Sequence, residues 1–206
     1  MVATVVPAAT SSPSATASVT TRVPASASAG ETLRLGRLIA DLEPLASADA
    51  AAFTLERRPL SLATLVRGTV EGLTGRFTEA GLTLRTDTEE VRVDGDEVRL
   101  RQVVTNQLTG ALKFVPAGGT VTITLHQDDG WAELKVADTG PGIPAGDLKH
   151  IFDLFFRSRT ARADGSGIGL AVAVAAELVA AHGGTITVDS ALGQGTAFTT
   201  RLPVLG

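Results

Sequence analysis

The chain has 206 residues, a formal net charge of −4 and a hydrophobic fraction of 44%, which suffice for one domain of ordinary size plus extensions. The acidic balance, without any block of Lys and Arg, argues against a protein that binds nucleic acid through its phosphates. Cysteine is absent, which excludes disulfides, thiolate nucleophiles and cysteine-ligated metals and permits a reducing cytoplasm.

Residues 1–30 have a low-complexity composition. Apart from Met1, Arg22 and Gly30, every position is Ala, Val, Pro, Ser or Thr, and no aromatic side chain is available for burial. We expect a disordered tail here. No basic cluster precedes its mild apolar patch, so we do not interpret it as a signal peptide. Since no apolar run in the chain reaches the roughly 18 residues that a bilayer requires, we expect no membrane contact.

Two helical patterns come after the tail. The first, in residues 31–59, places four leucines at spacings of three, four and three, and Pro44 should kink or end this helix near its C-terminus. The second runs from Leu60 to Leu73. Short alternating segments at residues 82–85 and 91–93 then predict two strands, and the next helix should begin near Asp96.

The helix beginning near Asp96 has an apolar stripe and a polar face. The stripe consists of Leu100, Val103, Val104, Leu108 and Ala111. The other face collects Asn106, Gly110 and Lys113 at spacings of four and three. From this helix alone, the polar face could be either solvated or part of a binding site.

Alternating segments at residues 121–125 and 132–136 predict a pair of strands. Asp138 comes next, in register with the apolar set of the second strand. A carboxylate on the inward side of a strand is costly unless something pairs with it. Either the strand has ended or Asp138 faces a pocket, and the glycines after it favour the pocket.

Three glycine clusters lie in the C-terminal third of the chain. DTGPGIP at 138–144 forces a tight turn beside Asp138. GSGIGLAVA at 165–173 leads directly into an apolar helix, an arrangement that can hold an anion, although a flexible turn into a helix looks the same and is the commoner explanation of this motif alone. It fits neither a dinucleotide fingerprint nor a P-loop. GQGTAF at 193–198 joins two alternating segments and alone would indicate a hairpin turn.

The order of these segments resembles the N, G1, F, G2 and G3 boxes of the sensor histidine kinase ATP-binding domain, a member of the GHKL ATPase superfamily. IFDLFFR supplies the F box. The resemblance covers roughly Leu60 to Pro203. It implies a two-layer α/β (α+β) sandwich of the Bergerat type, in which helices cover one face of a mixed sheet, and it implies ATP and Mg²⁺ as ligands.

The resemblance also implies roles for individual residues. Asp138 would accept a hydrogen bond from the adenine amino group, and Thr196 would help to hold adenine. Asn106, Lys113 and Arg157 would act at the phosphates. The complete set of implied nucleotide-binding residues is Asp138, Gly140, Gly142, Ile143, Gly165, Ser166, Gly167, Ile168, Gly169, Leu170 and Thr196. Phe152, Phe155 and Phe156 would anchor a lid, with ordinary core packing as the alternative.

One position departs from the family pattern. The N box normally carries a second asparagine that coordinates Mg²⁺, and here Gly110 occupies that position. Asn106, one turn earlier, could hold the ion through water. We therefore expect a real nucleotide pocket with a compromised metal site, because Mg²⁺ requires well-placed oxygen ligands.

The phosphoacceptor histidine of a complete sensor kinase is also missing. Residues 31–59 resemble a remnant of the second dimerisation helix and its linker, without the first helix, and 60–206 form the expected ATP-binding domain. His126, His150 and His182 are each better explained as structural. We expect a split kinase that phosphorylates a histidine on a separate partner chain, with a response regulator downstream. The alternatives are a pseudokinase or regulatory module, and an ATPase of the gyrase, chaperone or mismatch-repair kind, against which the short lid and the F box count.

Overall fold

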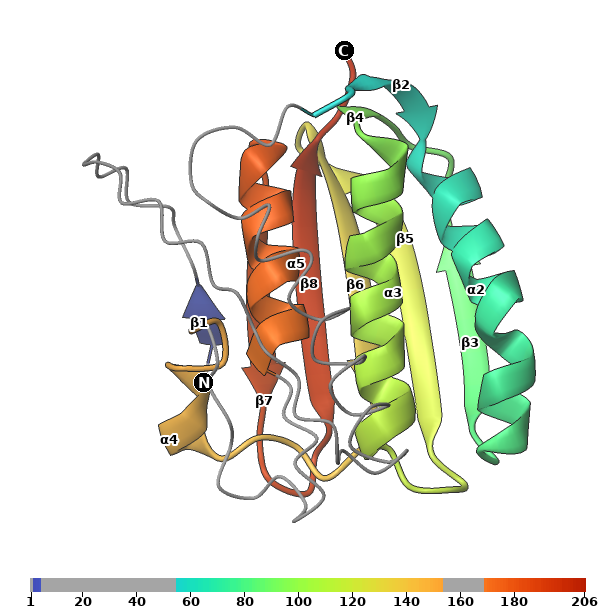
Figure 1. Cartoon of the computed structure of the whole chain (residues 1–206), viewed down its shortest axis with the longest axis vertical. Coiled ribbons are helices and arrows are strands. Elements are labelled where there is room, and N and C mark those ends of the chain that lie inside the picture. The colour runs from blue at the N-terminus through green and yellow to red at the C-terminus, as the bar shows by residue number, and fades with distance from the viewer. Residues whose placement is uncertain (1, 5–54, 154–168) are drawn as a thin grey trace, which may run out of the picture. The chain divides into compact units, whose positions relative to one another are not determined.

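The computed structural model describes residues 2–4, 55–153 and 169–206 (Figure 1). The predicted helix at 31–45 and the predicted phosphate loop at 165–168 lie outside the described residues. Within the part of the chain that is described, none of the helices has both the length and the apolar character needed to cross a bilayer.

A mixed sheet forms one layer of the fold, with strand order β1-β7-β8-β6-β5-β3. β3 and β5 are parallel, and the other neighbours are antiparallel. The strands are β1 (Val2–Thr4), β3 (Thr83–Thr88), β5 (Thr120–Asp128), β6 (Trp131–Asp138), β7 (Thr185–Ser190) and β8 (Thr196–Pro203). A separate pair, β2 (Arg58–Ser61) and β4 (Arg92–Gly95), is antiparallel.

Helices α2 (Leu62–Glu79), α3 (Glu97–Phe114) and α5 (Gly169–Ala181) cover one face of the large sheet, with α3 in the middle (Figure 1). The short helix α4 (Ala145–Leu148) comes after β6. The predicted apolar stripe of α3 and the inward residues of β5 and β6 are buried, so the core lies between the two layers. The predicted two-layer mixed α/β fold is confirmed.

The start of the second predicted helix was wrong. Leu60 belongs to β2, opposite Val93 of β4, and α2 begins only at Leu62. Ser61 has an extended backbone, and its side chain accepts a hydrogen bond from the Thr64 N–H at 3.1 Å. A serine in this role is a preferred helix cap, and it defines the boundary that the leucine spacing alone did not show.

The N-terminal residues also differ in part from the expected tail. Val2–Thr4 form β1, which pairs antiparallel with the edge of β7. The backbone of an edge strand presents unpaired N–H and C=O groups that a further strand can satisfy, even one of low-complexity sequence. The rest of the 1–30 segment lies outside the described residues.

A buried histidine joins the N-terminus of α3 to the C-terminus of α5. His182 Nε2 accepts a hydrogen bond from the Asp96 N–H at 3.0 Å, and Nδ1 lies 2.6 Å from the Leu178 carbonyl oxygen. The ring is therefore neutral, with its proton on Nδ1. Asp96 in turn caps α3 by accepting from the Val98 and Arg99 N–H groups. The structural role predicted for His182 agrees with this geometry.

The buried, neutral state of His182 predicts that the stability of the fold depends on pH. Burial lowers the pKa of His182 below its ordinary value, although the Leu178 carbonyl opposes the shift. The unfolded chain therefore binds more protons as the pH falls below about 6.5, and folding stability decreases there by at most about 1.4 kcal/mol per pH unit for one group. We expect His182→Gln to flatten this slope in urea unfolding between pH 7.5 and 5. A slope in His182→Gln equal to that of the wild-type chain would contradict the assignment.

Candidate functional site

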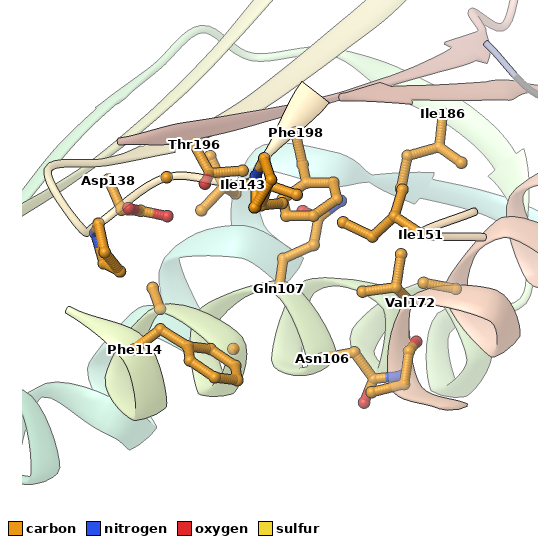
Figure 2. A pocket seen from close by; sticks show the side chains of 18 of the residues that line it. Asn106, Gln107, Phe114, Asp138, Ile143, Ile151, Val172, Ile186, Thr196 and Phe198 are labelled. Atoms are coloured by element: carbon orange, nitrogen blue, oxygen red, sulfur yellow. The ribbon is translucent and has the colours of Figure 1, made fainter. Parts of the chain in front are cut away.

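A cavity of about 160 Å³ lies between α3, α5 and the sheet (Figure 2). This is many times the space that one water molecule needs. Its walls are mostly apolar, and the polar side chains that line it are Asn106, Gln107, Asp138 and Thr196. Such an enclosure with a few polar groups is typical of a small-molecule site.

Asp138 lies where β6 ends, and its carboxylate points toward the cavity (Figure 2). The Gly140 N–H donates to its Oδ1 at 2.7 Å. Burial raises the pKa of Asp138 above its ordinary value, while the backbone N–H groups of Gly140 and Thr196 oppose the shift. Asp138 forms no ion pair with a cationic side chain of the described residues. Its partly desolvated carboxylate can therefore accept a hydrogen bond from a donor on a ligand.

The turn after β6 and the β7–β8 hairpin touch through their backbones. A Cβ atom on Gly142 would collide with the Ala191 carbonyl oxygen, and one on Gly195 would collide with the Asp138 carbonyl oxygen. Both glycines also have positive φ, at 73° and 82°. No other residue fits these positions, because a side chain would force apart the two turns that flank Asp138.

Ser190 bonds the same two turns together, a role that was not predicted from the sequence. Its hydroxyl donates to the Gly195 carbonyl at 2.7 Å and accepts from the Ile143 N–H at 2.9 Å. Its oxygen also lies 3.1 Å from Thr196 Oγ1. Since the single proton of Ser190 is engaged with Gly195, Thr196 donates in this contact. The available signal was a polar residue that continues the inward positions of Ile186 and Val188.

The α3 residues at the cavity are Asn106, Gln107, Gly110, Ala111 and Phe114. Asn106 Nδ2 donates to the Ala171 carbonyl in the first turn of α5 at 3.0 Å, so the opposite amide atom, Oδ1, is the one left for a ligand. A Cβ atom on Gly110 would meet no described atom within 4 Å. Gly110, the position at which the sequence departs from the N-box pattern, therefore leaves an open notch in the cavity wall.

Lys113 is not among the residues that line the cavity. Its side chain is exposed, and Nζ lies 5.4 Å from the ring centroid of Phe114. Phe114 does line the cavity, a position for which the sequence predicted no role. Gly140 is also absent from the lining and instead acts on Asp138 through its N–H.

Several expected site residues fall outside the described part of the chain. They are Phe155, Phe156, Arg157 and Gly165 to Ile168, together with the side chain of Leu170. Gly169 begins α5. Phe152 packs against a buried cluster of Ile143, Leu148, Ile151, Val172 and Val188, which agrees with ordinary core packing.

The described residues offer little to a metal ion. Among them, no group of three or more His, Asp and Glu side chains could bind one. Mg²⁺ bound by proteins retains several waters and commonly takes one or two protein oxygens together with substrate phosphates. Asn106 Oδ1 fits such a site as a single oxygen ligand. Among the described residues, the one carboxylate in the cavity lining is that of Asp138, at the end of β6.

The other two histidines have local partners. His126 of β5 lies opposite Glu133 of β6, with Nε2 3.6 Å from the Glu133 carboxylate. His150 Nδ1 lies 2.8 Å from Asp153 Oδ2. Neither lines the cavity. Both positions agree with the structural roles expected for them.

Comparisons with known proteins agree with this geometry. Histidine protein kinase DivJ of Caulobacter vibrioides is 36% identical over 170 residues, which are 82% of this chain and 28% of DivJ. The probable sensor histidine kinase TcrY of Mycobacterium tuberculosis is 38% identical over 86% of this chain and 37% of TcrY. The chain thus spans well under half the length of these two curated relatives.

Two solved structures are also similar. The mycobacterial sensor histidine kinase MprB matches with a TM-score of 0.63 and 32% identity, over 72% of this chain and 97% of the MprB chain. Full-length ShkA in complex with AMPPNP matches with a TM-score of 0.73 and 32% identity, over 85% of this chain and 37% of that chain. Residues 95–206 match the family described as histidine kinase-, DNA gyrase B- and HSP90-like ATPases. The chain belongs to this family.

Proposed function

We propose that this chain is the ATP-binding part of a histidine kinase and transfers the γ-phosphoryl group of ATP to a histidine on a separate partner chain. The observation that carries the proposal is the partly buried carboxylate of Asp138, which faces an apolar cavity. Burial raises the pKa of this carboxylate above its ordinary value. The fold can support several ATP-dependent activities, and the similarity to sensor histidine kinases favours phosphoryl transfer to a histidine among them.

Asp138 supplies the specificity for adenine. Its carboxylate accepts hydrogen bonds only, so it matches the exocyclic amine of adenine and repels the carbonyl oxygen that guanine carries at that position. Ile143, Phe114 and Phe198 line the cavity and supply apolar surface for the flat base. Thr196, held by Ser190, keeps its remaining lone pairs for a donor on the ligand.

The phosphates extend along α3 toward Asn106 and the first turn of α5. Asn106 Oδ1 would take Mg²⁺ directly or through water, and the ion, when bound, neutralises charge on the phosphates. The protein's own contribution is to position the nucleotide, because phosphoryl transfer depends on alignment and charge stabilisation. The acceptor histidine and the downstream response regulator are supplied by other chains in this proposal.

A second candidate is a regulatory module that binds nucleotide without transfer. Gly110 favours it, since the residue offers no oxygen ligand where the resemblance implies an asparagine. The two candidates share the same pocket and differ only in whether the bound nucleotide gives up its γ-phosphoryl group.

Removal of the Asp138 carboxylate should weaken nucleotide binding. We expect Asp138→Ala to lower ATP affinity in calorimetry by about 10- to 100-fold, the usual loss for a hydrogen bond to a charged group. Asp138→Asn keeps an acceptor oxygen and should lose less. Glu71→Ala, at an exposed acid on α2, is the control and should change nothing. Unchanged ATP uptake in Asp138→Ala would rule out the proposed adenine contact.

Restoration of the missing oxygen should strengthen the metal site. The open space over Gly110 admits a side chain without a clash with described atoms, so Gly110→Asn should fold and raise ATP affinity about tenfold when Mg²⁺ is present. Gly110→Ala also replaces the helix-interior glycine but adds no oxygen ligand, and it serves as the control. Equal affinities for the two variants, with and without EDTA, would show that the metal is held elsewhere.

Phosphoryl transfer is the direct test of the kinase proposal. The chain should pass radiolabel from [γ-³²P]ATP to the histidine-bearing hairpin of a complete sensor kinase whose own ATP-binding domain has been deleted. A hairpin with Gln in place of the histidine should stay unlabelled. Tight ATP binding with no label on hairpins from several relatives, including DivJ and TcrY, would favour the regulatory module instead.

A further inference from the structure

Leu192, in the turn between β7 and β8, is a large apolar side chain that is exposed and also lines the cavity. Among the described residues, the large hydrophobic side chains that stay exposed are those of Val98, Leu192 and Leu205. Leu192 is the one of these three in the cavity lining, and it is 63% exposed. A lone exposed leucine is ordinary, but a leucine at the mouth of an apolar cavity offers surface that a ligand can cover.

The backbone on both sides of Leu192 is held in place. The Ala191 carbonyl oxygen lies so close to Gly142 that a Cβ atom there would collide with it. The Gly193 N–H donates to the Pro141 carbonyl oxygen at 2.8 Å. These two contacts hold Leu192 against the turn after β6, so its backbone needs no further ordering when a ligand binds.

Leu192 lies at the same end of the cavity as Asp138. Pro141, which accepts the bond from the Leu192 turn, belongs to the turn that follows Asp138 at the end of β6. The other end of the Leu192 turn, at Gly195, lies against the Asp138 backbone carbonyl. A ligand that bonds to the Asp138 carboxylate therefore has Leu192 beside it.

The Asp138 carboxylate does not by itself select one base. It accepts hydrogen bonds only, and both adenine and cytosine carry an exocyclic amine that can donate to it. The two bases differ in size, since adenine has two fused rings and cytosine has one. The apolar surface around the base must therefore distinguish them at this site.

We propose that Leu192 gives the site its preference for purine over pyrimidine nucleotides, by packing against a two-ring base whose amine is bonded to Asp138. A one-ring base bonded to the same carboxylate leaves most of the Leu192 side chain in water. The contact therefore stabilises the two complexes unequally. This inference rests on the proposed nucleotide site and does not depend on phosphoryl transfer.

ATP and CTP are suitable probes, and their affinities for the whole chain can be measured by NMR titration. We expect Leu192→Ala to lower ATP affinity about fivefold and CTP affinity less than about twofold, so that the ATP-to-CTP affinity ratio falls. Leu205→Ala removes the same atoms from an exposed leucine outside the cavity lining and should leave both affinities unchanged. The thermal midpoint of Leu192→Ala should match that of the wild-type chain, because the truncated side chain is exposed.

An ATP-to-CTP ratio that Leu192→Ala leaves unchanged would overturn the proposal. Asp138→Ala separates this result from a failure of the proposed function, because loss of the carboxylate should weaken both nucleotides together. Weaker binding of both in Asp138→Ala, with an unchanged ratio in Leu192→Ala, would refute the role of Leu192 and support the adenine contact. Retained ATP binding in Asp138→Ala, with a lowered ratio in Leu192→Ala, would refute the adenine contact and support the contact of Leu192 with the base.

Discussion

The close approach of two backbone turns is the constraint on which the rest of the site depends. The turn after β6 and the β7–β8 hairpin meet at Gly142 and Gly195, where a single Cβ atom would collide with a carbonyl oxygen. Ser190 then bonds the hairpin to the Ile143 N–H. Within the turn after β6, the Gly140 N–H donates to the Asp138 carboxylate, and no cationic side chain of the described residues forms an ion pair with it. Rigid backbone support lets a partly buried charge remain ionisable and unpaired until a ligand arrives.

The same elements provide both stability and binding. One face of α3 packs on the sheet, while Asn106, Gly110 and Phe114 border the cavity. At the far end of the helix, Asp96 and His182 tie its N-terminus to the end of α5. Each helix that borders the cavity is therefore anchored at the end away from it. The cost of exposing polar groups to an apolar cavity is offset by packing elsewhere, as is common for functional sites.

Much of this could be predicted because the relevant signals are local. Alternation in β5 and β6 and the stripe of α3 derive from periodicity, and Asp138 stood out because its inward position conflicts with its charge. The start of α2 was missed because a single capping serine decides it. Ser190 and Gln107 were missed because their partners, Gly195 and Thr200, become neighbours only in the folded chain.

The notch over Gly110 makes this cavity wider than one with a side chain at that position. An adenosine analogue enlarged by an alkyl group that points toward α3 would have room here and would clash with an asparagine. The position that offers no side-chain oxygen to a metal ion thus offers extra volume to a ligand.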